Sequence, residues 1–152
     1  SNEVLSWKHA INFVENSYGY FDNFLSIPPT SPLRIEEDIF RIMSSLNSNI
    51  DIVLGISRSK KSPWFNMVTN EGGIKLVNKS SQIFRRQDTP LIFDITTIAY
   101  AAKVTYLKGC NNILEGKVKG VEIPEERSID IDNWFDLKLA RLLIESRIEN
   151  DS

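Results

Sequence analysis

Two aspartates, Asp130 and Asp132, have the residue type and spacing that most clearly permit chemistry. The segment 123–132, IPEERSIDID, places them one residue apart, at the end of an apolar strand-like stretch and just ahead of a helical pattern. Side chains alternate along a strand, so both carboxylates are expected on one side of it, at most ~7 Å apart. Such a pair suits Mg²⁺, which usually takes one or two carboxylates together with phosphate oxygens. The alternative is that Asp132 caps the helix and Asp130 is a solvated surface charge.

Arg34 is a candidate for binding an anionic substrate. It closes the segment 29–34, PTSPLR, a few residues after an expected strand. Its guanidinium can hold a carboxylate or a phosphate through two parallel hydrogen bonds. The alternative is an ion pair with Glu37 or Asp38 on the surface of the following helix.

A second group of candidates lies further along the chain. Arg86, between Arg85 and Gln87, can bind the carboxylate of a ligand, or it can belong to an exposed loop. Tyr100 lies in an apolar run and can line a ligand pocket or the core. Cys110, the single cysteine, has no histidine partner in the sequence, so thiol catalysis is not expected.

Helical and extended patterns alternate along the chain and predict an α/β fold. Such alternation favours a mostly parallel sheet with helices on both faces and with ligands bound beyond the carboxyl ends of the strands. An N-cap is expected at Thr30 or Ser31, and Asn133 with Asp136 resembles a capping box. Helices are expected at about 3–16, after Pro32, at 103–110 and at 133–148, and strands at 23–27, 51–57, 91–101 and 117–123.

The region 60–79 departs from this alternation. Two short extended runs, Phe65–Val68 and Ile74–Val77, flank the turn sequence 70–73, NEGG, and predict a hairpin inserted between the larger elements. A lone two-stranded hairpin is marginal in water, and Trp64 and Phe65 are residue types favoured at interfaces. We therefore expect this segment to mediate self-association.

Composition fits one globular domain over residues 1–152. Hydrophobic residues make up 41% of the chain, and a net charge of −2 gives no basic field for nucleic acid. No apolar run approaches the ~20 residues that span a bilayer, so no membrane partner is expected. The single cysteine and the absence of a signal-peptide pattern favour the reducing cytoplasm.

Four segments, in order, resemble the acylneuraminate (CMP-sialic acid) cytidylyltransferases. They are PEERSIDIDNWFD at 124–136, PTSPLR at 29–34, SPWFNMV at 62–68, and RRQD at 85–88 with the later Tyr100. The resemblance implies a Rossmann-like, three-layer nucleotidyltransferase fold with an inserted dimerisation arm at about 60–84. It also implies a homodimer.

The resemblance implies cytidylyl transfer from CTP to a sialic-acid-like nonulosonic acid. Asp130 and Asp132 would bind Mg²⁺, and Arg34, Arg86, Gln87 and Tyr100 would contact substrate. A related synthetase acting on 3-deoxy-manno-octulosonate and a non-catalytic, dimerising or complementing protein remain as alternatives.

Three departures from the family pattern bear on these expectations. The family opens with a strand and a phosphate-holding loop of the type ARxGSKG, and nothing like it occurs in residues 1–152. The resemblance therefore implies that the chain is the C-terminal two-thirds of such an enzyme, without its first strands, and we expect it to be inactive alone. Pro28 replaces a substrate-reading glutamine, and Thr96 replaces an asparagine on the sugar side.

Overall fold

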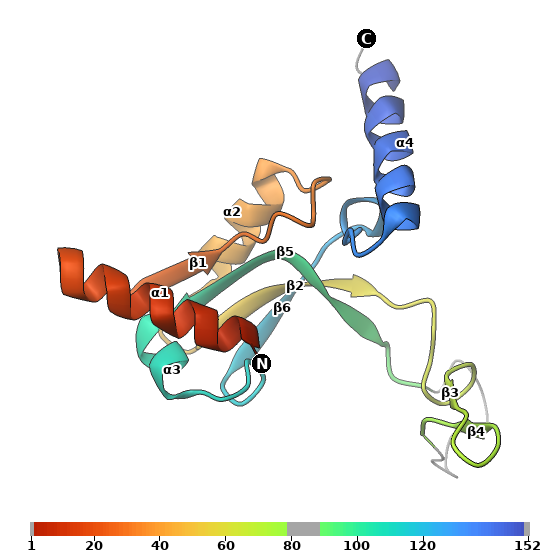
Figure 1. The fold of residues 1–152 in the computed structure, drawn as a ribbon, viewed down its shortest axis with the longest axis horizontal. Coiled ribbons are helices and arrows are strands. Elements are labelled where there is room, and N and C mark those ends of the chain that lie inside the picture. Colours follow the sequence, from red (N-terminus) through yellow and green to blue (C-terminus); the bar gives the residue numbers. More distant parts are fainter. Residues whose placement is uncertain (1, 79–88, 151–152) are drawn as a thin grey trace. The chain divides into compact units, whose positions relative to one another are not determined.

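The computed structural model describes residues 2–78 and 89–150, which belong to two compact units (Figure 1). The first unit combines Ser1–Ser57 with Ile95–Ser152, and the second is Arg58–Asp94. The elements are α1 (Asn2–Tyr18), β1 (Asn23–Ser26), α2 (Glu36–Ser45), β2 (Ile52–Arg58), β3 (Val68–Thr69), β4 (Lys75–Leu76), β5 (Phe93–Lys103), α3 (Val104–Gly109), β6 (Val118–Glu122), the short 3₁₀ helix η2 (Glu125–Arg127) and α4 (Trp134–Asn150). The alternation expected from the sequence is confirmed.

The main sheet has four strands in the order β1-β5-β2-β6. β1 is antiparallel to β5, and β2 is parallel to β6. β5 runs antiparallel to β2. The end of β5 lies beside the start of β2, since the Lys103 N–H donates to the Asp51 carbonyl (2.9 Å). Further along β2, Gly55 lies beside Thr96 and Ile98, which come earlier in β5. The α/β class is confirmed. The sheet is mixed, and its antiparallel pairs could not be predicted from the alternation of helices and strands. β1, β2 and β6 nevertheless share one direction, so their carboxyl ends meet at one edge.

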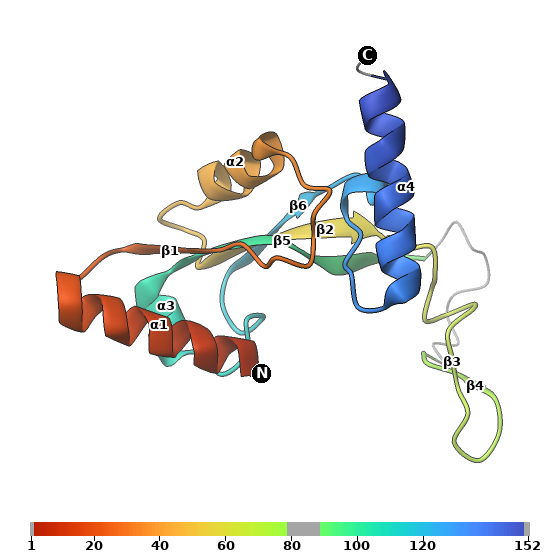
Figure 2. The ribbon, with the colours of Figure 1, turned by 45° about the horizontal axis from the view of Figure 1, so that its top comes forward.

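Helices cover both faces of this sheet (Figure 2). On one face α1 and α3 bury Trp7, Ile11 and Leu107 against side chains of β2 and β5. On the other face Ile42 of α2 packs with Val53 and with neighbours on β5 and β6. Burial of such side chains stabilises a fold by about 1.5–3 kcal/mol each, so these two clusters hold the three layers together.

Side chains cap the first turns of α2 and α4. α2 starts later than expected, at Glu36, and the Ile35 N–H donates to Asp38 Oδ2 (3.2 Å) in place of a cap from Thr30 or Ser31. The expected capping box of α4 is confirmed. The Asn133 N–H donates to Asp136 Oδ2 (3.1 Å), and the Asp136 N–H donates to Asn133 Oδ1 (3.1 Å).

The second unit contains the expected hairpin in a shorter form. β3 and β4 are two residues each and pair antiparallel, with Val68 opposite Leu76 and Thr69 opposite Lys75. Gly72 and Gly73 have positive φ, a conformation that glycine adopts without a steric penalty. The hairpin strands are exposed on both faces.

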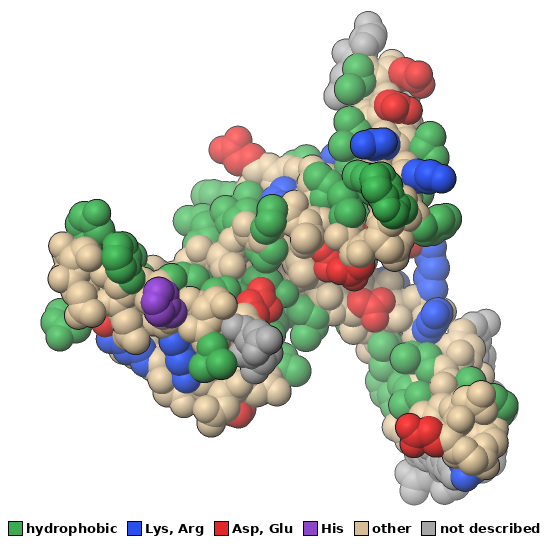
Figure 3. Space-filling model, in the orientation of Figure 1, with side chains coloured by type: hydrophobic (Ala, Val, Ile, Leu, Met, Phe, Trp, Pro, Cys, Tyr) green, Lys and Arg blue, Asp and Glu red, His purple; other side chains and the backbone are tan. Residues whose placement is uncertain are grey.

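Within residues 2–78 and 89–150, no helix combines the length and apolar character needed to cross a bilayer. Hydrophobic side chains nevertheless gather on the visible surface over α4 (Figure 3). Trp134 and Phe135, in its first turn, are both largely exposed, whereas Ala140 is buried. In the described structure α4 therefore leaves large apolar side chains of its first turn exposed.

Candidate functional site

The loop that follows β1 meets the segment that follows β6. The backbone N–H of Ile131 donates a hydrogen bond of 2.9 Å to the carbonyl oxygen of Thr30. Ser31, which is fully buried, shares a hydrogen bond of 2.6 Å with the hydroxyl of Thr97 on β5. The PTSPLR loop and the aspartate pair therefore lie side by side at one edge of the sheet.

The aspartates lie in an irregular segment between η2 and α4. β6 ends at Glu122 and η2 intervenes, so the expected strand placement of Asp130 and Asp132 is wrong. The position just ahead of a helix is confirmed. Asp132 is exposed and is not the cap of α4, because Asn133 fills that role, while the Asp132 N–H donates to Asp136 Oδ2 (3.0 Å). The alternative of Asp132 as helix cap is therefore wrong.

Asp130 is half-buried and has an unused acceptor. Its Oδ1 atom is buried and has no hydrogen-bond partner among the described residues. A buried carboxylate oxygen without a donor is costly, and such an atom calls for a physical explanation. A hard cation is one group that would satisfy it, because carboxylate oxygens are the protein ligands that Mg²⁺ prefers. The donor chemistry of Asp130 thus fits a Mg²⁺ ion.

The described residues supply few further metal ligands. No group of three or more His, Cys, Asp or Glu side chains suited to a metal ion occurs within residues 2–78 and 89–150. A site centred on Asp130 and Asp132 would depend on oxygens of a ligand, as Mg²⁺ sites that bind nucleotide phosphates do. A surface depression of about 270 Å³ lies beside the pair and is lined by Ile131, Asp132, Asn133, Trp134 and Leu137.

A further acidic side chain, that of Glu3, interacts with Asp130. Burial, and then the Asp130 carboxylate, raise the pKa of Glu3 in α1. Burial, followed by the charges of Glu3 and Asp130, raises the pKa of Tyr100 to about 12. Sequence reasoning missed Glu3, because its nearness to Asp130 depends on the packing of α1 against the sheet.

Tyr100 is part of the core and stands beside this acidic group. Its side chain is 4% exposed, and its ring centroid lies 5.1 Å from that of Trp7 in α1. A contact between Tyr100 and a sugar stays a prediction. The ring's packing explains why an aromatic residue is needed here without reference to a ligand.

Arg34 binds the backbone of its own loop. Its Nε donates to the Ser31 carbonyl (2.7 Å) and its Nη2 to the Pro28 carbonyl, while Nη1 is buried without a partner among the described residues. Burial lowers the pKa of this guanidinium. The alternative pairing with Glu37 or Asp38 is not what the structure shows. A substrate contact through Nη1 stays a prediction.

The two residues that depart from the family pattern have different surroundings. Pro28 is the carbonyl partner of Arg34 at the entrance of the loop. Thr96 is 4% exposed, and its hydroxyl has no hydrogen-bond partner in the described part of the chain. Gly55 lies directly opposite, where an added Cβ would stand 2.5 Å from Thr96 Oγ1. Arg86 and Gln87 lie outside the described residues.

A buried ion pair links the two halves of the site. Arg127 Nε donates to Asp38 Oδ2 and Arg127 Nη2 to Asp38 Oδ1, both at 2.8 Å, and Asp38 is fully buried. Burial alone raises the pKa of Asp38, but hydrogen bonds from Arg127 and from the Ile35 N–H reverse this and leave it below its ordinary value. The hydrogen bond to Asp38 raises the pKa of Arg127. No sequence pattern pairs residues 89 positions apart, so the pair was missed.

The chain is similar to a protein of known name. No family model matches the chain. Over 130 residues it is 26% identical to post-translational flagellin modification protein B of Campylobacter coli. The matched region covers 84% of this chain and 54% of that protein, so the chain spans about half the length of its relative. This is a distant similarity.

Proposed function

We propose that the whole protein transfers a cytidylyl group from CTP to a sialic-acid-like nonulosonic acid. The products are a CMP-sugar acid and pyrophosphate. The anomeric hydroxyl of the sugar acid forms a bond to the α-phosphorus of CTP, the bond from that phosphorus to the bridging oxygen breaks, and the hydroxyl proton passes to a base. The proposal extends to a sugar acid destined for modification of a surface protein, because the relative is named for flagellin modification.

One observation carries the proposal: the half-buried Asp130, with an unused carboxylate oxygen, next to the loop that bears Thr30 and Ser31. Nucleotidyl transfer needs positioned reactants and neutralised phosphate charge more than it needs a covalent intermediate. A carboxylate held at the carboxyl edge of an α/β sheet is suited to that task. The distant relative and the four ordered segments add independent support.

In this proposal Asp130 and Asp132 hold Mg²⁺ on their oxygens. When bound there, the ion supplies charge neutralisation and orientation for phosphate oxygens. The loop from Pro28 to Arg34 forms the adjoining wall, kept rigid by the bonds of Arg34 to its carbonyls. Arg34, Arg86, Gln87 and Tyr100 are the proposed contacts to the sugar acid. The proposed assembly is a homodimer formed through the hairpin unit.

The test is pyrophosphate release by the whole protein in the presence of Mg²⁺. CTP and UTP are each offered with sialic, legionaminic and pseudaminic acids and with 3-deoxy-manno-octulosonate. The proposal requires turnover with CTP and one of the nine-carbon acids, and the 152-residue chain alone is expected to show none. Preference for 3-deoxy-manno-octulosonate would select the related synthetase. Turnover only with UTP would reject the cytidylyl assignment.

A non-catalytic protein is the second candidate, and a specific observation favours it. Thr96 fills the position of a sugar-side asparagine, yet its hydroxyl is buried against Gly55 and cannot serve a ligand at the surface. In that case the chain would only complete or dimerise another protein. Absence of turnover with every acid and nucleotide, together with a stable complex with a separate catalytic chain, would establish this alternative.

A further inference from the structure

Between α2 and η2, the ion pair of Asp38 with Arg127 occupies a position from which it can control the aspartate site. We infer that Arg127 and Asp38 are positioning residues, which set the place of Asp130 without touching substrate or metal. The inference rests on the proposed metal site at Asp130 and Asp132. It concerns how that site is built, and it assigns a role to Arg127, inside the segment 124–136, and to Asp38, which lies outside the four segments.

The geometry of the pair is that of a specific clamp. Two parallel bonds of 2.8 Å join the guanidinium to both carboxylate oxygens of Asp38. This bidentate arrangement fixes the plane of the arginine as well as its distance. Asp38 Oδ2 also accepts the Ile35 N–H at the start of α2 (3.2 Å), so the carboxylate is itself held in place. A bidentate ion pair held in this way can fix the position of the chain segments next to Arg127 and Asp38.

The chain between Arg127 and Ile131 is fixed at both of its ends. Arg127 anchors the beginning through Asp38, and the hydrogen bond from the Ile131 N–H to the Thr30 carbonyl anchors the end. The Ser128 hydroxyl donates to the Pro124 carbonyl (2.8 Å), which closes the turn from Pro124 to Ser128 around Arg127. Asp130 lies inside this short span. A shift of the Arg127 anchor would therefore move Asp130 Oδ1 relative to Thr30 and Ser31.

Chemistry explains why an arginine suits this position better than a lysine. A lysine keeps the positive charge but loses the planar fork, so it cannot hold both oxygens of Asp38 in one orientation. Partners that orient metal ligands typically change metal affinity by roughly 10–100-fold when they are altered. An effect of that size at Asp130, without global unfolding, is the signature expected of a positioning residue.

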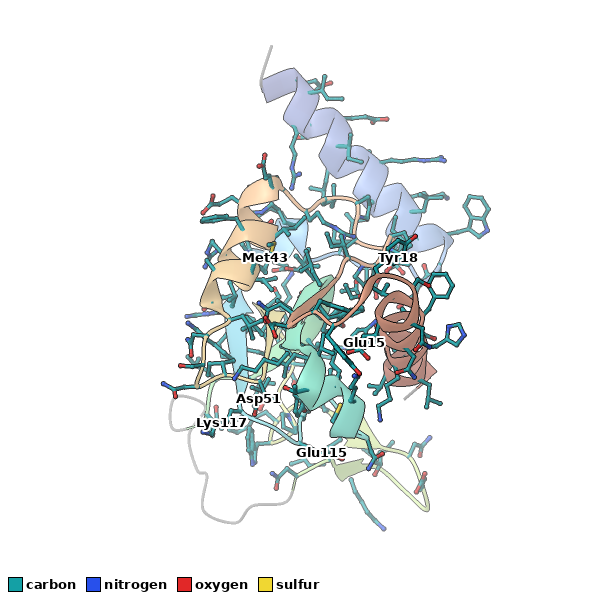
Figure 4. All side chains as sticks on the ribbon, turned by 90° about the vertical axis from the view of Figure 1, so that its left-hand side faces the viewer. Glu15, Tyr18, Met43, Asp51, Glu115 and Lys117 are labelled. Carbon is teal, nitrogen blue, oxygen red and sulfur yellow. The ribbon has the colours of Figure 1, made fainter. Side chains whose placement is uncertain are left out.

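The experiment measures Tb³⁺ binding to the whole protein by luminescence, an observable independent of turnover. Trp134 lines the same depression as Asp132 and would sensitise the ion, so Trp134→Phe identifies the signal that comes from this site. The test variant is Arg127→Lys. The control is Lys108→Gln, which removes another ion pair of the same unit. In that pair, Lys108 Nζ of α3 lies 2.6 Å from Oε1 of Glu15 in α1 (Glu15 is labelled in Figure 4).

The expected result is that Arg127→Lys weakens Tb³⁺ binding roughly tenfold or more, while Lys108→Gln leaves it unchanged. In the Asp130→Asn background, Arg127→Lys should add nothing, because its effect passes through Asp130. An unchanged affinity in Arg127→Lys, with weakened binding in Asp130→Asn, would overturn the inference and leave the proposed reaction standing.

The remaining outcomes also decide between the two claims. Unchanged binding in Asp130→Asn would remove the metal site and the inference with it. Coupling between Arg127 and Asp130 in a protein that turns over no sugar acid would support the inference and reject the proposed reaction. Asp38→Glu serves as the second variant. Unfolding in both it and Arg127→Lys would show that the pair only holds the fold, and would reject a positioning role.

Discussion

The backbone N–H of Ile131 donates a hydrogen bond of 2.9 Å to the carbonyl oxygen of Thr30. This bond joins the loop after β1 to the segment after β6, and Ser31 next to it is tied to Thr97 by a second bond of 2.6 Å. The two motifs that stand furthest apart in the sequence therefore share one rigid edge. Both bonds lie within the chain itself, and such internal support is what a preorganised binding site requires.

Replacing Asp38 by Asn is expected to destabilise the protein by about 3–5 kcal/mol, because it leaves the Arg127 guanidinium without its charged partner. The Asp38 side chain is fully buried, and that of Arg127 is 20% exposed. Urea unfolding at neutral pH measures the loss. Glu15→Gln is the control, since the Lys108 side chain of the pair it breaks is 39% exposed, and the loss of such a pair near solvent is expected to cost less, about 1 kcal/mol. Equal losses in the two variants would contradict this account.

The same residue predicts how stability depends on acid. The hydrogen bonds of Asp38 outweigh its burial and hold its pKa below the ordinary value of 3.8, so the folded protein keeps this carboxylate charged more readily than the unfolded chain does. Its contribution is complete above that value and is lost as the pH falls through the lowered pKa. Unfolding curves recorded between neutral and acid pH should show a smaller acid-dependent loss in Asp38→Asn than in the wild type.

Gly55 and Thr96 are predicted to be energetically coupled. An added Cβ at Gly55 would lie 2.5 Å from Thr96 Oγ1 and 3.3 Å from Ile123 Cγ1, so Gly55→Ala should cost about 1–3 kcal/mol. Thr96→Val should be neutral or stabilising, because it removes a buried hydroxyl without a partner among the described residues. Gly55→Ala combined with Thr96→Ala should recover part of the loss. Strict additivity in this double-mutant cycle would show that the two residues do not meet.

Tyr100 predicts a loss of stability in alkali. Burial first, then Glu3 and Asp130, raise its pKa to about 12 from 10.0, so the folded protein holds the phenol proton more tightly than the unfolded chain does. The resulting stability is present below pH 10 and disappears as the pH rises toward 12. An absorbance titration of tyrosinate should lack its most alkaline step in Tyr100→Phe. Loss of a step near the ordinary value of 10.0 in that variant would instead place Tyr100 in water.

Self-association is predicted to depend on the hairpin unit. Ile74 is 68% exposed and Val68, on the opposite side of the turn, is 50% exposed, although both are strongly apolar. Sedimentation of the wild type should show a dimer, and Ile74→Lys should shift it toward monomer. Lys75→Ala, at the neighbouring exposed position, is the matched control. A monomeric wild type at micromolar concentration would remove the role of this segment in assembly.

Local signals predicted the elements of this fold well. The capping box of Asn133 and Asp136 involves residues three positions apart, and the buried strand β2 shows as an uninterrupted apolar run, so both can be found without tertiary information. Asp51, just before β2, shows the limit of such reasoning. It accepts the Lys117 N–H at 2.9 Å across the sheet (Figure 4), a contact decided by strand order alone.

The candidate site was predictable in part. The type and spacing of Asp130 and Asp132 pointed to them, and both the aspartates and the PTSPLR loop were expected to follow strands. Their place on a strand was mispredicted, because β6 stops at Glu122 and the turn of η2 follows at Glu125. The Asp38–Arg127 pair depends on long-range packing, which no local pattern encodes.

A Mg²⁺ titration of pyrophosphate release from CTP and a nonulosonic acid is the most direct measurement of the central claim. It compares the whole wild-type protein with Asp130→Asn, Asp132→Asn and the control Glu15→Gln. The account predicts that either asparagine lowers turnover by roughly a hundredfold or more, because it removes a group that stabilises developing charge. Each variant should also need a higher Mg²⁺ concentration, and its free energy of unfolding should be unchanged. The control should behave as the wild type. Unchanged turnover and unchanged Mg²⁺ dependence in both asparagine variants would contradict the account.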